Sequence, residues 1–266
     1  MAYIGPFLFN AVRFALGTAV ILPFMFVRRR KRISSRPGVP PWKGLLAGLV
    51  LFAGASLQQA GLVYTTAGNA GFVTGLYVVI VPILGIFSGQ FSGRRTWLGV
   101  FLATAGMYIM TAADSSRMAS GDLIVFAGAV FWAIHIQLIS RLMKRYDAIV
   151  LASVQFALCS LLSLSGAILT EKIHLSGIKL AAVPILYGGI VSVGIAYTLQ
   201  VIAQKKAHPA HAAIIMSLEA VFALIGGWIL LKEPLTFRGT FGGFLMLAAM
   251  MVSSTGQRRK RSTTGL

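Results

Sequence analysis

The chain has 266 residues, of which 57% are hydrophobic and only 11% are charged, and its formal net charge is +18. A soluble domain carries about 25% charged residues, so this composition favours a protein solvated by lipid. The cations stand in short runs between apolar blocks, which argues against nucleic acid as the partner. Cys159 is the single cysteine, so an intrachain disulfide is excluded.

Nine apolar blocks predict nine transmembrane helices, because a helix needs about 20 apolar residues to cross the hydrocarbon core of a bilayer. We therefore expect an all-α polytopic membrane protein with short connections and no soluble domain. In chain order the predicted helices cover residues 6–27, 43–63, 70–90, 96–112, 122–141, 148–170, 180–202, 210–231 and 237–255.

Cationic side chains are divided unequally between alternate loops. The loops after the first, third, fifth and seventh predicted helices, with the C-terminal tail, hold 18 lysine and arginine residues, and the opposite loops hold 5. Cytoplasmic loops carry the excess of cations in membrane proteins. We expect an integral protein of a bacterial-type cytoplasmic (inner) membrane, with a basic tail at 257–266 inside the cell.

The chain also contains an internal repeat. Residues 45–110 match residues 185–250 at a fixed shift of 140, with 11 identities in 66 positions. The matched loops differ in charge, since Thr65 and Thr66 correspond to Lys205 and Lys206. A similar apolar pattern with opposite loop charge is typical of inverted repeats, which form secondary transporters with a substrate site near the bilayer midplane. We expect repeats at 1–113 and 114–256.

The two predicted repeats are unequal in length. The second holds five predicted helices and the first holds four, because the partner of the helix at 122–141 would precede Met1. We expect ten helices in the complete form, with the first of them missing from this sequence.

Two segments give the chain a resemblance to a known family. They are YTTAGNAGF at 64–72 with Gly75, Leu76 and Tyr77 after it, and SLEAVFA at 217–223 with EPLT at 233–236. In these motifs the chain resembles the EamA-type transporters of the drug/metabolite transporter superfamily. The resemblance implies two inverted five-helix units and export of a small polar metabolite or drug. In that family the first helix helps to wall the central cavity, and its absence is a departure from the pattern.

Glu219 is the first candidate for a functional residue, because it stands near the middle of the predicted helix 210–231. An ionisable group at the bilayer centre costs a few kcal/mol, so it faces a cavity or a partner. It either carries a proton or contacts substrate, or it locks the helix to its neighbours by hydrogen bonds. These alternatives stay open.

Arg13 is the second candidate, about two turns from the outer surface. A guanidinium group suits a carboxylate or a phosphate, although it can equally extend outward to the membrane surface or pair with a helix-end carbonyl. Its counterpart in the repeat is Gln155, because residues 12–16 match residues 154–158 at a shift of 142.

Other polar residues in the predicted helices either line a pore or hold helices together. His135 is suited to proton relay, but it can equally be a structural hydrogen-bonding group. The remaining candidates share only their polarity in an apolar segment, where hydrogen bonds between helices are common. They are Gln58, Gln59, Asn69, Tyr77 and Tyr197.

The sequence therefore predicts a secondary active transporter that works by alternating access, with a small-molecule substrate and the lipid bilayer as its partners. Proton coupling is a hypothesis that depends on Glu219. No metal, cofactor or catalytic motif is found, which disfavours an enzyme. The alternatives are a membrane scaffold without transport activity and an inactive truncated fragment.

Overall fold

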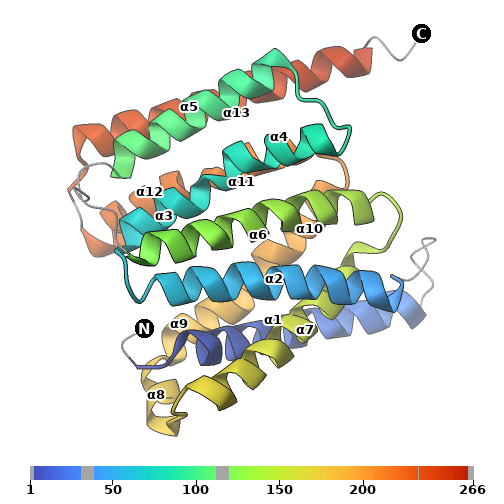
Figure 1. Ribbon diagram of the computed structural model, residues 1–266, viewed down its shortest axis with the longest axis vertical. Helices are drawn as coiled ribbons and strands as arrows, with labels where there is room; N and C mark the ends of the chain where they lie inside the picture. The colour runs from blue at the N-terminus through green and yellow to red at the C-terminus, as the bar shows by residue number, and fades with distance from the viewer. Residues whose placement is uncertain (1–2, 31–38, 112–119, 233, 263–266) are drawn as a thin grey trace. The chain divides into compact units, whose positions relative to one another are not determined.

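The computed structural model describes residues 3–30, 39–111, 120–232 and 234–262, and all regular elements within these ranges are helices (Figure 1). Seven segments of the described chain are helices long and apolar enough to cross a membrane. They are Pro6–Val27, Pro41–Gly61, Ala67–Phe87, Ser120–Leu142, Ala148–Thr170, Ala182–Gln204 and Pro209–Gly226. The expectation of an all-α polytopic membrane protein is confirmed. The other two predicted helices fall within α5 (Arg94–Thr111) and α13 (Phe237–Ser262), and nine membrane crossings stay a prediction.

The helices form two compact units, and each unit takes segments from both halves of the sequence. Unit 1 combines Met1–Val63 with Leu138–Lys206, and unit 2 combines Tyr64–Gln137 with Ala207–Leu266.

Unit 1 is built around an antiparallel pair, α1 (Pro6–Arg30) and α7 (Ala148–Thr170), on which the other helices pack. Glu171 follows the last residue of α7 and accepts hydrogen bonds from the backbone N–H groups of Phe7 and Leu8, at 2.7 and 3.0 Å. These two N–H groups lie in the first turn of α1, where no intrahelical acceptor is available to them. A carboxylate there also suits the positive end of the helix dipole.

The remaining helices of unit 1 cover both members of this pair. Helix α2 (Pro41–Gly61) packs on α7, and a π-helical segment, η1 (Tyr187–Tyr197), packs on α1. The predicted helix 180–202 therefore contains two short α-helices, α9 (Ala182–Leu186) and α10 (Thr198–Gln204), on either side of η1, and α8 (Leu175–Leu180) precedes them.

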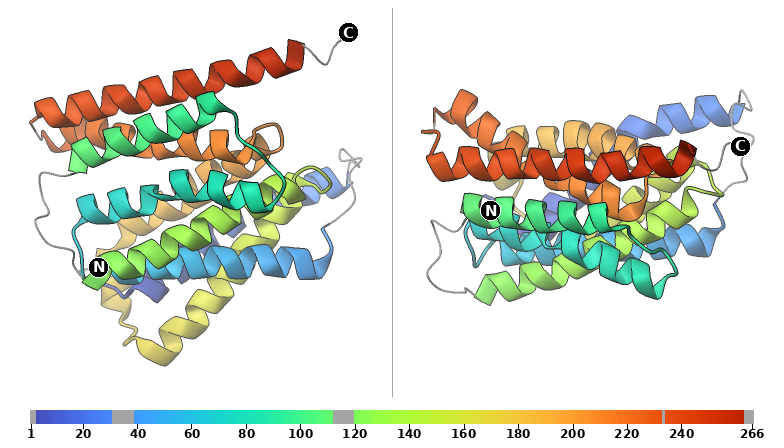
Figure 2. Two further views of the ribbon diagram at one scale, coloured as in Figure 1. Left: turned by 45° about the horizontal axis from the view of Figure 1, so that its top comes forward. Right: turned by 90° about the horizontal axis from the view of Figure 1, so that it is seen from above.

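Unit 2 is built around the antiparallel pair α5 and α13, which run side by side in both views of Figure 2. Gly106 and Gly242 face each other, and a Cβ atom on either residue would meet the carbonyl oxygen of the other. Glycine lets two helices approach this closely in a membrane.

The same unit holds five further helices. They are α3 (Ala67–Gly75), α4 (Tyr77–Phe87), most of α6 (Ser120–Leu142), α11 (Pro209–Ser217) and α12 (Glu219–Leu231).

Two predicted helices of unit 2 are interrupted. At Leu76, between α3 and α4, the backbone N–H bonds to the carbonyl of Val73, three residues back, at 3.2 Å. At Leu218, between α11 and α12, the N–H bonds in the same way to Ile215, at 3.2 Å. These two interruptions lie 142 positions apart, where sequence comparison predicted a shift of 140. The difference arises because uniformly apolar helices allow a two-residue slip without loss of hydropathy match.

In unit 1, a glycine of one helix packs closely against α7 and another glycine packs closely against α1. A Cβ atom on Gly48 would meet Leu158 at 2.8 Å and the Cα of Gln155 at 3.2 Å. A Cβ atom on Gly189 would meet Leu16 at 2.6 Å and the carbonyl oxygen of Arg13 at 3.1 Å. Leu16 and Arg13 precede Leu158 and Gln155 by 142 positions, which is the shift at which residues 12–16 match residues 154–158.

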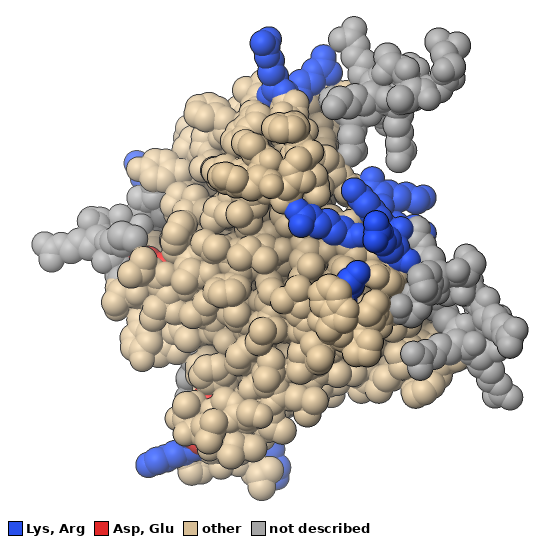
Figure 3. Space-filling view, turned by 45° about the vertical axis from the view of Figure 1, so that its right-hand side comes forward, with Lys and Arg blue, Asp and Glu red and all other residues tan. Residues whose placement is uncertain are grey.

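The surface of the chain is apolar over wide areas. Large hydrophobic side chains are exposed on most helices, among them Phe87, Phe101 and Leu169 at 86%, 68% and 83% of their area. On the face drawn in Figure 3, lysine and arginine side chains gather in groups at the margins of a mainly uncharged surface. Exposed apolar side chains on this scale suit a lipid environment and would be a liability in water.

Candidate functional site

Each of the two interrupted helices has one candidate residue directly after its interruption. Tyr77 is the first residue of α4 and Glu219 is the first residue of α12, each directly after its interruption. Tyr77 is 4% exposed and therefore buried, whereas Glu219 is exposed. An exposed carboxyl group near the middle of an apolar span is costly in lipid, which favours a polar surrounding for it.

The start of each interrupted segment is fixed by local sequence. Thr66 caps α3, with its hydroxyl oxygen accepting from the backbone N–H of Asn69 at 3.2 Å. Pro209 occupies the first turn of α11, where its missing N–H carries no cost. The Asn69 side chain is buried in the first turn of α3, so it does not lie with Tyr77, two turns further on.

His135 is buried in α6, and its ring meets the edge of Trp132 with 6.0 Å between ring centroids. This contact links two residues of one helix at adjacent positions on its face. The sequence places no acidic residue within one helical turn of His135. The structure thus adds an aromatic neighbour, and proton relay through His135 stays a prediction.

In unit 1, Arg13 lies inside α1 with 7% of its area exposed. The central carbon of its guanidinium group is 5.3 Å from the ring centre of Phe9 and 5.0 Å from that of Phe14. Cation–π contacts of this kind offset part of the cost of burying a charge. Arg13 therefore does not extend to the membrane surface, which removes the snorkelling alternative.

Tyr197 is linked to Arg13 through the ring of Phe14, which both side chains contact. Gln155 is fully buried in α7, one residue before Phe156. The Tyr197 ring lies 6.3 Å from Phe14 and 6.4 Å from Phe156, and those two phenylalanine rings are 5.9 Å apart. Gln58 and Gln59 are half-buried near the C-terminal end of α2.

Three further polar residues that are buried inside the helices were not identified from the sequence. Asn10 is fully buried one turn before Arg13, Ser163 is fully buried in α7, and Gln137 of α6 donates from Nε2 to the carbonyl of Val81 at 2.8 Å. A signal was present, because each is a polar residue inside an apolar span. The sequence search gave priority to charged residues, and small polar ones are common enough in membrane helices to be overlooked.

Chemically, these residues do not assemble a nucleophile, a base and an oxyanion site, which an acyl-transfer enzyme would require. They are polar and charged groups held inside apolar, interrupted and antiparallel helices, which is the organisation of a membrane transport protein. Comparison with known proteins bears this out. The EamA-like transporter family matches residues 1–112 and 119–255, and the chain belongs to that family.

Several relatives carry names that agree with this assignment. An uncharacterized transporter of Archaeoglobus fulgidus is 32% identical over 94% of this chain and 77% of its own length. A second uncharacterized transporter of that organism is 25% identical over 96% of this chain and 90% of its own. A crystal structure of another protein superposes with a TM-score of 0.79 at 21% identity, covering 96% of this chain and 88% of that one, which shows the shared fold.

Proposed function

We propose that the protein is a secondary active transporter that moves a small polar solute across the cytoplasmic membrane by alternating access. Membership of a transporter family supports the general activity, and the family resemblance suggests export as the direction. The positively charged loops support a topology with the C-terminus in the cytoplasm.

The observation that carries the proposal is the pair of interrupted helices. Transporters place substrate and coupling ions where membrane-spanning helices are discontinuous near the midplane. Here the interruptions at Leu76 and Leu218 have the same hydrogen-bond pattern, and α4 packs against α11. An interruption that recurs in this way is expected if an ancestral segment was duplicated.

The contacts within each unit support an inverted arrangement of the two copies. Helices α1 and α7 are equivalent by sequence shift and run antiparallel, because the start of α1 meets the end of α7 at Glu171. Helices α5 and α13 are antiparallel too, since Gly99 lies against Ala249 while Gly106 lies against Gly242. Two equivalent helices that pack antiparallel are related by an axis perpendicular to them, which lies in the plane of the membrane.

Glu219 is the residue that we propose for proton coupling. It is an exposed acid directly after an interruption, seven residues before the end of the span Pro209–Gly226. A carboxyl group there can bind a proton from one side and release it to the other when access alternates. The matching position in the first copy holds Tyr77, which has no carboxyl group.

Reconstituted protein tests the transport activity directly. Proteoliposomes that contain a pH-sensitive dye are given an inward proton gradient, and candidate solutes are added from outside. Solute-dependent proton flux that empty liposomes do not show supports proton-coupled transport. Solute flux without proton flux would refute proton coupling and still support a transport function. Absence of flux with every solute class contradicts the proposed function and favours a scaffold.

A further inference from the structure

The guanidinium group of Arg13 presents a donor pair that the protein leaves unused. Nε and Nη2 lie on the same edge of the planar group, so their N–H bonds point in the same direction. Both atoms are buried, and neither has a hydrogen-bond partner. The faces of the group are occupied instead by Phe9 and Phe14, at 5.3 and 5.0 Å. This edge is the one with which arginine binds a carboxylate or a phosphate through two parallel hydrogen bonds.

No acid of unit 1 neutralises this charge among the described residues. The two acids that the structure describes there are committed to helix starts: Asp147 accepts from the backbone of Ile149 and Val150, at 2.9 and 3.2 Å, and Glu171 accepts from Phe7 and Leu8. A buried cation without a partner costs several kcal/mol in a protein interior. Such an arrangement is retained where a ligand supplies the opposite charge.

Further unpaired donors lie beside the arginine. Asn10 is on the same face of α1, one turn earlier, and neither its amide nitrogen nor its amide oxygen has a partner. Across the helix pair, the Ser160 hydroxyl donates to the carbonyl of Ala11 at 2.8 Å, which sets the register of α7 against this turn of α1. Ser163 follows on α7, where it is buried. Buried polar groups are normally hydrogen-bonded, so several orphans in one place indicate a missing partner.

Two other features shape the space around the arginine. Gly188 of η1 stands against its side chain, because a Cβ atom there would meet Cδ of Arg13 at 3.7 Å. The wider π-helical turn and the absence of a side chain at this position leave room next to the guanidinium stem. Nε and Nη2 are themselves enclosed, so a solute reaches them only when the surrounding helices separate, as alternating access requires.

We propose that Arg13, with Asn10 one turn away, binds the carboxylate or phosphate group of an anionic solute, which makes the substrate of this transporter an organic or inorganic anion. The inference rests on the proposed transport function and narrows its substrate class. It assigns Arg13 the recognition of the anion and leaves proton coupling to Glu219.

Ligand-dependent thermal unfolding of the full chain in nanodiscs of zwitterionic lipid tests the inference. The probes are inorganic phosphate, succinate and 3-phosphoglycerate, with succinamide as a neutral analogue of succinate and choline chloride to match ionic strength. We compare the wild type with Arg13→Met, Arg13→Lys and Asn10→Leu. Lys144→Gln, which removes an exposed cation, is the control.

We expect at least one anion to raise the unfolding temperature of the wild type and of Lys144→Gln, with no rise from succinamide. Arg13→Met loses the response, and Arg13→Lys weakens the apparent affinity about tenfold or more, because an ammonium group lacks the parallel donor pair. Without ligand, Arg13→Met unfolds at or above the wild-type temperature, since an unpaired buried charge has been removed. A purely structural arginine would give the opposite shift. If Arg13→Met does not fold, Arg13→Lys and Asn10→Leu carry the comparison.

The inference is overturned if no anion stabilises the wild type, or if succinamide stabilises it as well as succinate does. It is also overturned if Arg13→Met keeps the full response to the anion. Finally, Arg13-dependent stabilisation by anionic phosphatidylglycerol alone in the nanodisc would assign the donor pair to a lipid headgroup and overturn it. Transport measured in parallel separates this inference from the proposed function. If Arg13→Met still transports a neutral solute, the anion site is refuted and the transport function stands. If the protein binds an anion but transports no solute, the anion site stands and the transport function is refuted.

Discussion

Tyr77 and Glu219 occupy matching places in unit 2, each as the first residue of a helix that resumes after an interruption, and only Glu219 carries a carboxyl group. The interruptions before them have the same backbone hydrogen bonds, so the two segments share a backbone feature and differ in the chemistry of the residue that follows it. If the two segments are copies, as we propose, an acid stands at this position in the second copy only.

Glu219→Gln is the variant that tests this assignment. The amide keeps the size and hydrogen-bonding capacity of the side chain and cannot bind or release a proton. We expect solute flux to become independent of an imposed pH gradient in proteoliposomes. Glu171→Gln changes an acid in the other unit that only caps a helix, and it should leave the dependence on the gradient intact. Wild-type behaviour of Glu219→Gln would refute proton coupling through this residue.

Gly242 and Gly243 form a matched pair for the packing of α5 against α13. A Cβ atom on Gly242 would meet the carbonyl oxygen of Gly106 and the backbone of Met110, whereas one on Gly243 would meet only side-chain atoms at 3.8 and 3.9 Å. We expect Gly242→Ala to destabilise the protein by about 1–3 kcal/mol, as overpacking does, and Gly243→Ala to have little effect. Thermal unfolding in detergent measures both. Equal unfolding temperatures for the two variants would show that this helix contact is not formed.

Gly48 and Gly189 should respond alike, because they stand at equivalent contacts on α7 and α1. A methyl group at either position meets atoms of the facing helix, Leu158 for Gly48 and Leu16 for Gly189. We expect each alanine variant to lose about 1–3 kcal/mol of stability. Gly71→Ala, where no atom lies within 4 Å, should gain about 0.4–1 kcal/mol by restricting the unfolded chain. A large loss in only one of the first two variants would contradict their equivalence.

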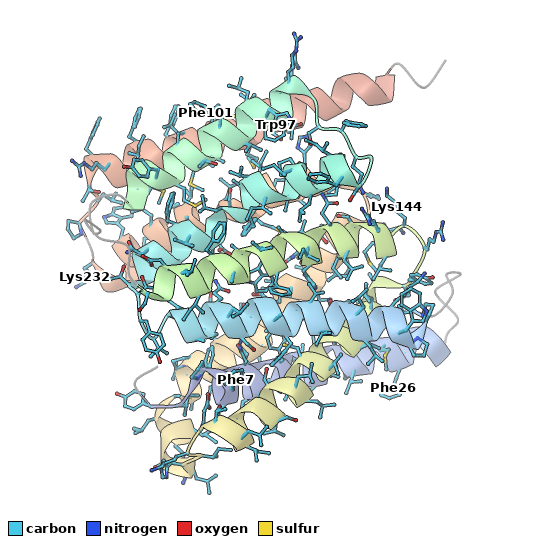
Figure 4. The ribbon with its side chains drawn as sticks, viewed as in Figure 1. Phe7, Phe26, Trp97, Phe101, Lys144 and Lys232 are labelled. Atoms are coloured by element: carbon cyan, nitrogen blue, oxygen red, sulfur yellow. The ribbon has the colours of Figure 1, made fainter. Side chains whose placement is uncertain are left out.

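Glu171 determines how α1 begins. Glu171→Ala leaves the N–H groups of Phe7 and Leu8, two of the first donors of the helix, without their acceptors. We expect a loss of about 1 kcal/mol, in the range of other helix-capping residues. Figure 4 labels Phe7, the first of these two residues, at the start of α1. Lys172→Ala alters the exposed neighbour and should be neutral. Faster amide hydrogen exchange confined to the first turn of α1 in Glu171→Ala would locate the effect, and unchanged exchange there would refute it.

The helices and their membrane character could be predicted from sequence because both depend on composition along the chain. Residues 6–27 and 148–170 were assigned within a few residues of α1 and α7 for this reason. The interruptions at Leu76 and Leu218 could not be predicted in this way, since neither lies at a proline. The π-helical segment η1 could not be predicted either, because a π-helix changes the backbone hydrogen-bond register and requires no particular residue type.

The candidate site was predicted in part. Arg13 was identified by its charge, but its environment depends on which helices meet, and the aromatic rings and the unpaired edge come from packing. Asn10 and Ser163 became visible only when α1 and α7 were seen to bury them. The interruptions lie 142 positions apart, two more than the shift of 140 in the longer sequence match, because identity in apolar segments is too sparse to fix the register of the repeat.

The central claim is that the two copies of the repeat face opposite sides of the membrane, and cysteine labelling tests it most directly. In a Cys159→Ala background, Thr66→Cys and Lys206→Cys place one exposed thiol before α3 and before α11. A membrane-impermeant maleimide is applied to intact and to permeabilised cells. We predict labelling of Thr66→Cys in intact cells and of Lys206→Cys only after permeabilisation. Labelling of both from the same side would contradict the account.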